Sequence, residues 1–209
     1  MKKTKIKILE AARILFNEQG YSAVTIRMIA KAMNISSGNL NYHFKTREEI
    51  LEALYFEMVS SFDERVASLK DDEISFKSIQ EDMEESLKQM MKYRFIWTDL
   101  YNLLRLNAKI KSHFEKVYAE RYQGFSYLIS YLQNKTWMKD FSSKIEERLL
   151  IERMINLGNT GLYNSFLYKQ ELDKEEVRHQ SNSLLFALYP YLTKEGKTVF
   201  MKEVDVWGE

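Results

Sequence analysis

The sequence predicts an all-α protein. Only seven of its 209 residues are Gly and one, Pro190, is Pro. Gly and Pro interrupt helices and mark the turns of strand-rich folds, so their scarcity favours long helices. The hydrophobic residues, 45% of the chain, recur at the three- and four-residue spacing of buried helix faces. This length allows one or two domains, and this apolar content can form a sizeable core.

The first predicted helix covers residues 5–19. One apolar stripe runs along it, formed by Ile8, Ala12, Leu15 and Phe16. Gly20 follows directly. It is expected to end the helix, because Gly adopts the left-handed conformation of a C-terminal cap without steric cost.

Two short helices joined by a tight turn are predicted next. Thr25 and Ser36 are their expected N-caps, since a hydroxyl there accepts a hydrogen bond from an amide that lacks a helical partner. The chain reverses at Asn34, a residue type that tolerates the left-handed conformation, and Ile35 fills the angle between the helices. The first of these helices has an i, i+3, i+4, i+7 face of Ile26, Ile29, Ala30 and Met33.

The second short helix, residues 36–44, is unusually polar. Only Leu40 and Phe44, one turn apart, are expected to be buried. Its outward positions are Ser37, Gly38, Asn39, Asn41, Tyr42 and His43. Asn can pair with adenine through two hydrogen bonds, and a helix-turn-helix places its second helix in the major groove of DNA. Taken alone, the same residues also fit an ordinary exposed segment.

Charge favours the DNA-binding interpretation. Residues 1–47 contain nine Lys or Arg and two Glu, which gives +7, whereas residues 48–209 contain 22 Lys or Arg and 28 Asp or Glu, which gives −6. The net charge of +1 therefore hides a basic head on an acidic body. A basic head is typical of a surface that binds phosphates. Its cations include an N-terminal arm and two residues after the polar helix: Lys2, Lys3, Lys5, Lys7, Lys45 and Arg47.

A longer helix is predicted for residues 46–69. The run Thr46-Arg47-Glu48-Glu49 has the pattern of a capping box, in which the first and last side chains satisfy backbone amides at the helix start. The acidic run Asp71-Asp72-Glu73 then marks a loop.

Further helices are predicted for the rest of the chain. The last of them begins at Asp173, where Glu176 stands in a box-like position, and it is expected to end near Pro190. The predicted ranges are 75–93, 95–105, 107–134, 142–169 and 173–190.

Residues 4–51 resemble the DNA-binding domain of the TetR-type (TetR/AcrR) family of transcriptional regulators. The string GYSAVTIRMIAKAMNISSGNLNYHFKTREEIL closely follows the signature of that family. Asn41 departs from the pattern, since the family usually has Tyr there, and Asn34 replaces the more usual Gly of the turn. The resemblance implies a helix-turn-helix DNA-binding domain at residues 1–47 and a helical effector-binding and dimerisation domain at residues 48–209.

The polar helix is expected to read bases while its flanks hold phosphates. Ser37, Asn39 and Asn41 are the predicted base readers. The other predicted DNA contacts lie near the ends of the two short helices: Thr25, Arg27, Ser36, Tyr42, His43 and Lys45.

The helices near 145–169 and 173–190 carry wide apolar faces, which predict either a dimer interface or internal core packing. Two glycines within the first of them suggest that another helix approaches closely, because a glycine inside a helix costs about 1 kcal/mol against Ala. The family resemblance implies dimerisation through a four-helix bundle. The predicted interface residues are Met154, Leu157, Gly158, Gly161, Leu162, Phe166, Leu184 and Leu188.

Residues 83–131 are dense in Met and aromatic side chains, which suit an apolar pocket with a few polar anchors. Aromatic stripes at helical spacing also occur in ordinary cores. The predicted ligand-binding residues are Met83, Leu87, Met90, Trp97, Tyr101, Phe114, Tyr118, Tyr122 and Phe125.

No catalytic, cofactor or metal site is predicted. His43, His113 and His179 lack metal-ligand spacing, there is no cysteine, and no Gly-rich phosphate loop follows a strand. The N-terminus lacks the continuous apolar stretch of a signal peptide, and no window approaches the apolar run of about 18 residues that a membrane span needs. We therefore expect a cytoplasmic protein without membrane contact.

Together these features predict a homodimeric repressor that binds near-palindromic operator DNA. A small apolar or aromatic ligand is expected to release it. The alternative is a DNA-binding architectural or partner-binding protein of the same fold that has no small-molecule effector.

Overall fold

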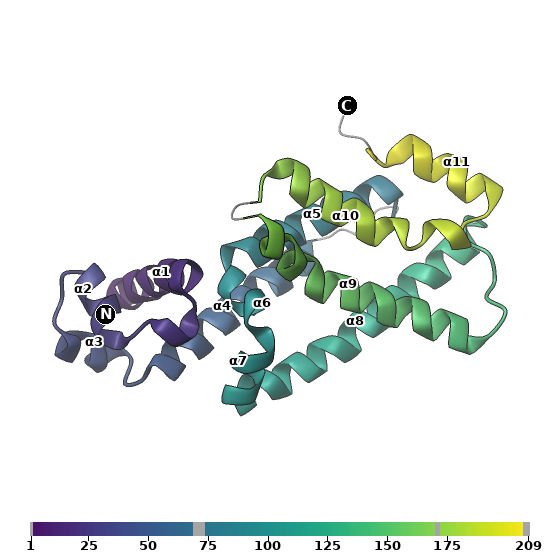
Figure 1. Ribbon diagram of the computed structural model, residues 1–209. Coiled ribbons are helices and arrows are strands. Elements are labelled where there is room, and N and C mark those ends of the chain that lie inside the picture. The colour runs from purple at the N-terminus through teal and green to yellow at the C-terminus, as the bar shows by residue number, and fades with distance from the viewer. Residues whose placement is uncertain (1, 69–73, 170–171, 207–209) are drawn as a thin grey trace. The chain divides into compact units, whose positions relative to one another are not determined.

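The computed structural model describes residues 2–68, 74–169 and 172–206, and these segments are all-α (Figure 1). No strand occurs in these ranges, where the β-type pairing is one isolated bridge between Met138 and Leu192. The all-α prediction is therefore confirmed. The predicted end of the fourth helix at Leu69 and the predicted loop Asp71-Asp72-Glu73 lie outside the described residues.

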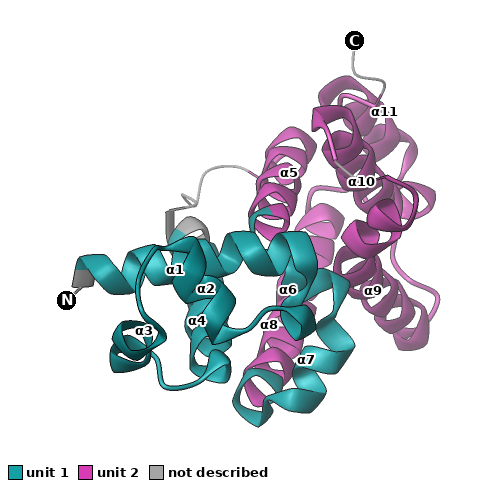
Figure 2. Cartoon of the chain, turned by 60° about the vertical axis from the view of Figure 1, so that its left-hand side comes forward, with its two compact units in different colours: residues 1–69, 92–111 teal, residues 70–91, 112–209 magenta. Residues whose placement is uncertain are grey.

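The chain forms two compact units (Figure 2). Unit 1 comprises residues 1–69 and 92–111, and unit 2 comprises residues 70–91 and 112–209. The predicted division by function, between residues 47 and 48, falls inside unit 1 at the start of a helix. That functional division stays a prediction.

Unit 1 contains the two short helices and their surroundings. The predicted helices at 5–19, 36–44 and 46–69 appear within a few residues of their expected bounds. The predicted helix at 95–105 is instead two short helices, because the chain leaves helical conformation at Asp99 (φ −130°, ψ 23°). The elements of unit 1 are α1 (Lys2–Gln19), η1 (Tyr21–Ala23), α2 (Ile26–Ala32), α3 (Ser37–His43), α4 (Arg47–Ser68), α6 (Arg94–Thr98) and α7 (Leu100–Leu106).

The segment that enters α6 is hydrogen-bonded to α1. The backbone oxygen of Lys92 accepts hydrogen bonds from Arg13 Nη1 at 2.9 Å and Asn17 Nδ2 at 3.0 Å. Asn17 Oδ1 in turn accepts from the amide of Phe95 at 3.1 Å. The Phe95 ring also lies 5.2 Å from that of Phe16, both buried. This segment and α1 are thus joined by polar and apolar contacts.

Unit 2 is built from the remaining helices. The predicted helices at 75–93, 107–134 and 142–169 are confirmed to within a few residues, but the helix expected to end near Pro190 ends at Phe186. A further helix, α11, has no counterpart among the predicted elements. The elements are α5 (Phe76–Lys92), α8 (Ala108–Asn134), α9 (Lys144–Tyr168), α10 (Lys174–Phe186), η2 (Tyr189–Tyr191) and α11 (Lys194–Glu203), of which α5 and α8 also contribute residues to unit 1. They enclose a core that includes Phe76, Leu132, Ile151, Met154, Leu185 and Phe200.

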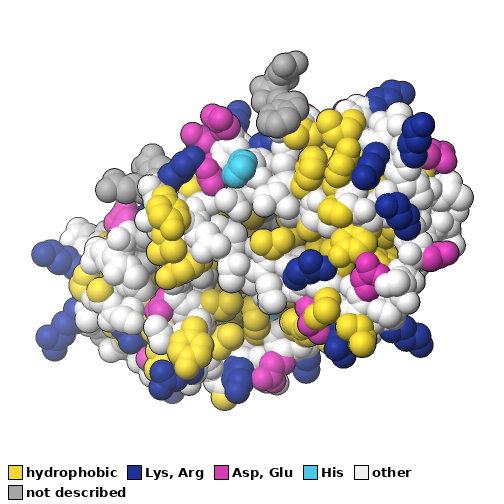
Figure 3. Space-filling view, turned by 45° about the vertical axis from the view of Figure 1, so that its right-hand side comes forward, with side chains coloured by type: hydrophobic (Ala, Val, Ile, Leu, Met, Phe, Trp, Pro, Cys, Tyr) yellow, Lys and Arg dark blue, Asp and Glu magenta, His cyan; other side chains and the backbone are white. Residues whose placement is uncertain are grey.

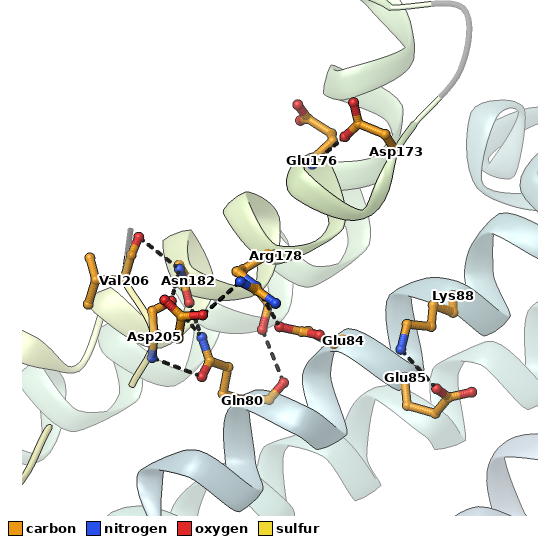
Figure 4. Close-up of polar contacts among 11 residues, drawn as sticks. Gln80, Glu84, Glu85, Lys88, Asp173, Glu176, Arg178, Asn182, Asp205 and Val206 are labelled. Carbon is orange, nitrogen blue, oxygen red and sulfur yellow. Dashed lines mark hydrogen bonds and ion pairs between the residues drawn. The ribbon is translucent and has the colours of Figure 1, made fainter. Parts of the chain in front are cut away.

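A buried polar network joins α5 and α10 to the chain after α11 (Figure 4). The side chains of Gln80 and Asn182 are hydrogen-bonded to each other at 2.6 Å, and both donate to the backbone oxygen of Asp205. Arg178 pairs with the Asp205 carboxylate at 2.7 Å. Because buried polar groups are costly without partners, these contacts stabilise one position of the C-terminal segment.

Asp173 caps α10 as predicted, but Glu176 does not complete a capping box. The amide of Glu176 donates to Asp173 Oδ1 at 2.8 Å (Figure 4). The Glu176 carboxylate instead accepts hydrogen bonds from Ser165, Lys169 and Gln180. Burial opposes its ionisation, yet these hydrogen bonds outweigh burial and lower the pKa of Glu176 to about 2. Glu176 therefore links α10 to the end of α9.

Candidate nucleic-acid interface

The helix-turn-helix forms as the sequence predicts. Thr25 Oγ1 accepts from the amide of Met28 at 3.3 Å, and Ser36 Oγ accepts from the amide of Asn39 at 3.1 Å, so both hydroxyls cap their helices. Asn34 has the left-handed conformation, with φ of 55°. Local residue chemistry therefore determines where α2 ends and where α3 begins.

The helix α3 presents a polar face. Leu40 is fully buried and Phe44 nearly so, which confirms the two predicted inward positions. Asn39 and Asn41 are exposed, and Ser37 is half-buried. These three predicted base readers lie on a single short helix, which is anchored in the core by Leu40 and by its C-cap, Phe44.

The predicted phosphate contacts lie at the ends of α2 and α3. Thr25, Arg27, Ser36 and Lys45 are exposed, and His43 is half-buried. Tyr42 is 72% exposed, with its ring edge-to-face on His43 at 5.3 Å. An aromatic ring so exposed at the C-terminal end of α3 is available for contact with a ligand, and its hydroxyl can donate to a phosphate oxygen.

Six cations of the head have no acidic partner within the described part of the chain. They belong to the first turns of α1, to α2 and to the segment after α3: Lys3, Lys5, Lys7, Arg27, Lys31 and Lys45. The predicted N-terminal arm is therefore helical, because α1 begins at Lys2. The Lys5 ammonium lies 5.3 Å from the Phe44 ring centroid, which connects the start of α1 to the end of α3. Arg13, in contrast, is paired with Glu10 at 2.6 Å. Unpaired cations beside a polar helix are the arrangement that a phosphate backbone attracts.

Arg47 departs from the sequence interpretation, which grouped it with Lys45 on the basic surface. Its Nη1 lies within hydrogen-bond distance of the backbone oxygens of Tyr21, Ser22 and Val24, at 3.1, 3.2 and 2.9 Å. The guanidinium also lies 4.2 Å from the Tyr21 ring centroid. Arg47 is therefore turned inward, against the chain that enters α2.

The predicted ligand-binding residues are divided between the two units. Trp97 and Tyr101 belong to unit 1, where Trp97 is buried and Tyr101 is 73% exposed. The other seven belong to unit 2. Of these, Met83, Tyr122 and Phe125 pack against the core, Met90 is buried, Leu87 and Phe114 are half-buried, and Tyr118 is 41% exposed. Which of them contact a ligand stays a prediction.

The predicted interface residues also separate into two groups. Met154, Leu162 and Leu188 are buried inside the chain, so they support a surface and do not form one. Leu157 is exposed, and Phe166 and Leu184 are half-buried. Hydrophobic side chains do reach the surface at several places on the face shown in Figure 3. Those that α9 exposes are Ile145, Leu149, Leu157, Tyr163, Leu167 and Tyr168.

The two glycines of α9 face α10 of the same chain. A Cβ atom added to Gly161 would lie 2.9 Å from Gln180 Oε1, and one added to Gly158 would lie 4.0 Å from Leu184 Cδ2. The sequence interpretation placed both glycines at a close helix approach and left a dimer interface and internal packing open. At Gly161 the close approach is to a helix of the same chain.

Within the described residues, no helix is long and apolar enough to cross a membrane. The same segments contain no group of three or more His, Asp or Glu side chains arranged to hold a metal ion.

Two family models match the chain. Residues 8–54 match the model described as bacterial regulatory proteins of the tetR family, and residues 57–200 match one described as a bacterial transcriptional repressor. The first match covers α2 and α3 with most of α1, and the second covers most of the remaining helices.

Individual proteins also resemble parts of the chain. The probable HTH-type transcriptional regulator YttP of Bacillus subtilis is 30% identical over 91 residues, which are 44% of this chain and 44% of that protein. The chain therefore matches less than half of the length of that relative.

Two solved structures share the fold. A TetR-family transcriptional regulator from Marinobacter aquaeolei has a TM-score of 0.83 at 21% identity, covering 95% of this chain and 96% of that one. A transcriptional regulator from Saccharomonospora viridis in complex with choline has a TM-score of 0.73 at 22% identity, covering 93% and 100%.

Proposed function

Because this chain belongs to the tetR family of bacterial regulatory proteins, we propose that it represses transcription by binding a specific operator. The observation that carries the proposal is α3, a capped helix whose exposed face is amide- and hydroxyl-rich and is flanked by unpaired cations. Such a helix fits the major groove, where Asn side chains pair with base edges. A DNA-binding role also implies that the protein acts in the cytoplasm.

Within this interface, we propose that Ser37, Asn39 and Asn41 read bases. The exposed residues at the helix ends and Lys45 bind the phosphate backbone of DNA. The division follows from position, because base readers must lie on the helix that enters the groove. Phosphate contacts lie around it and fix its register.

The division can be tested with Asn39→Ala and Lys45→Ala. Asn39→Ala is expected to cost about 1–3 kcal/mol and to relax the preference at particular base pairs. Lys45→Ala is expected to weaken binding to all sequences and to lower the salt slope of log affinity by roughly one unit. Titration of labelled operator and of point-mutated operators at several salt concentrations measures both effects. A uniform loss in Asn39→Ala, or an unchanged slope in Lys45→Ala, would remove that residue from its role.

The repressor is proposed to be a homodimer that uses the apolar face of α9 together with α10. The support is the set of exposed apolar side chains on α9, from Ile145 to Leu167, which a monomer leaves in water. A twofold pair of heads presents two reading helices, so the operator is proposed to be near-palindromic. Light scattering of the full chain at micromolar concentration measures this state, and a monomer would contradict it.

A small apolar or aromatic ligand is proposed to release the repressor from DNA. The support is the Met and aromatic content of α5 and α8, together with a structural relative of the same fold that holds choline. Movement of α5 can reach the head through the hydrogen bonds between Lys92 and α1, and a tilt of α4 can change the separation of the two reading helices.

Release implies a coupling free energy of about 1–3 kcal/mol between the two sites. Bound operator must then lower the affinity for the ligand by the same factor by which bound ligand lowers the affinity for operator. Calorimetry on any compound that thermally stabilises the chain, with and without operator, measures this factor. Equal affinities would favour the architectural alternative without an effector.

A further inference from the structure

The guanidinium of Arg47 binds backbone oxygens within the head. Arg47 is the first residue of α4, and its side chain leaves the helix to reach three carbonyls at η1 and its C-cap, those of Tyr21, Ser22 and Val24. Its side chain is only 26% exposed, with one face against the Tyr21 ring. Tyr21 itself is 1% exposed and is packed edge-to-face on Phe16 at 5.2 Å.

The position of Arg47 has an electrostatic cost, which indicates a role other than attraction of phosphate. A cation at the N-terminus of a helix is unfavourable, because the helix dipole places partial positive charge there. Glu48 and Glu49 follow in the same turn and offset part of that cost. A cation that only had to attract phosphate would gain more from an exposed position, as at Lys45 two residues earlier.

The target of Arg47 is the chain that leads into α2. Its shortest hydrogen bond, at 2.9 Å, is to the oxygen of Val24. The peptide group that joins Val24 to Thr25 is planar. A hydrogen bond that fixes the Val24 carbonyl oxygen therefore also fixes the plane in which the backbone N and Cα atoms of Thr25 lie. Thr25 is the N-cap of α2, and the first amides of that helix follow it.

We infer that Arg47 is a positioning residue for DNA binding. It orients Thr25 and the N-terminus of α2 toward the DNA backbone and does not contact a phosphate itself. The inference rests on the proposed DNA-binding function. It assigns opposite roles to the two cations after α3, since Lys45 contacts phosphate and Arg47 shapes the site.

The matched variants Arg47→Met and Lys45→Met test this assignment. Each removes one positive charge, and the two positions are two residues apart. Affinity for an operator obtained by selection with the wild-type chain is measured over a series of KCl concentrations. Arg47→Met is expected to weaken binding roughly tenfold at every concentration with the wild-type slope. Lys45→Met is expected to lower the slope by about one unit.

A double-mutant cycle with Thr25→Ala adds a measurement that a general loss of stability would not change. Thr25→Ala is expected to weaken the wild-type chain but to add little in the Arg47→Met background, because Thr25 is already misplaced there. If the double variant loses affinity by the product of the two single fold-losses, Arg47 does not act through Thr25 and the inference is wrong.

Circular dichroism establishes that each variant is folded. If Arg47→Met does not fold, Arg47→Lys replaces it, since lysine keeps the charge but lacks the planar group that lies on Tyr21. Weaker binding by Arg47→Lys with an unchanged slope supports the inference. Wild-type affinity in Arg47→Lys, or a slope loss in Arg47→Met equal to that of Lys45→Met, would show a phosphate contact instead. A wild-type chain that selects no DNA sequence would overturn the proposed function and not this assignment alone.

Discussion

Gly38→Leu is expected to weaken operator binding severely while the head remains folded. Gly38 lies in the first turn of α3 with ordinary helical φ, and an added Cβ atom would meet only Ser36 Oγ, at 3.8 Å. Neither backbone conformation nor internal packing therefore requires glycine there. A glycine in a helix costs up to about 1 kcal/mol against good helix formers, so the folded head is expected to tolerate Leu or to gain stability.

Contact with DNA supplies the missing reason, since absence of a side chain lets α3 lie close to the groove. A Leu side chain would hold the helix away and break at least one base contact per head. At about 1–3 kcal/mol for each such contact, a dimer loses roughly 30-fold in affinity or more. Gly124→Leu is the matched control. Gly124 is also an exposed helical glycine with nothing within 4 Å of an added Cβ atom, but it lies on α8.

Thermal unfolding and operator titration of the two variants measure the effect. Both variants are expected to unfold at or above the unfolding temperature of the wild type. Only Gly38→Leu is expected to have a lower affinity for operator DNA. Operator affinity of Gly38→Leu within a few-fold of wild type would show that α3 does not approach DNA closely at this position.

Gly196→Ala is expected to have the largest effect on stability. A Cβ atom at Gly196 would lie 2.0 Å from the backbone oxygen of Trp137, which already accepts a hydrogen bond from the amide of Thr193 at 2.9 Å. A backbone oxygen held in this way cannot move aside as a flexible side chain can. Overpacking costs typically about 1–3 kcal/mol, and this contact is expected to reach or exceed the upper end.

Urea unfolding monitored by circular dichroism measures that cost. Gly124→Ala is the control, because the same chemical change at an open helical position is expected to be neutral or slightly stabilising. If Gly196→Ala lies within about 0.5 kcal/mol of wild type, the range typical of unconstrained surface substitutions, then α11 is not packed on residue 137 as described.

The head is predictable from sequence because its determinants are local. Thr25 and Ser36 each cap a helix within three residues of themselves, and Asn34 has the left-handed conformation that its residue type tolerates. Leu40 and Phe44 identify the buried side of α3 by spacing alone. Short-range chemistry of this kind can be read without knowledge of tertiary contacts.

The features that sequence reasoning missed depend on distant contacts. Arg47 and Lys45 look alike in sequence, and only the contacts with the carbonyls of Tyr21, Ser22 and Val24 make Arg47 a structural residue. Gly161 gave no indication whether the helix near it belonged to the same chain, and the structure places Gln180 of α10 there.

The helix α11 was not predicted because Gly196, in its first turn, is a poor helix former. Its Thr193 cap was the available signal, since its hydroxyl accepts from the amide of Gly196 at 3.0 Å. The Met residues of α5 and the aromatic residues of α8 were ambiguous because core and pocket linings use the same side chains.

The most direct test of the central claim is selection of DNA from a random pool by the full-length chain. The proposed function predicts enrichment of one motif made of two inverted half-sites, with centres about 10 base pairs or a multiple of that apart. It also predicts that Asn39→Ala selects a motif relaxed at specific positions. A pool that remains random after repeated selection, under salt conditions in which the chain still binds DNA, would contradict sequence-specific repression by this protein.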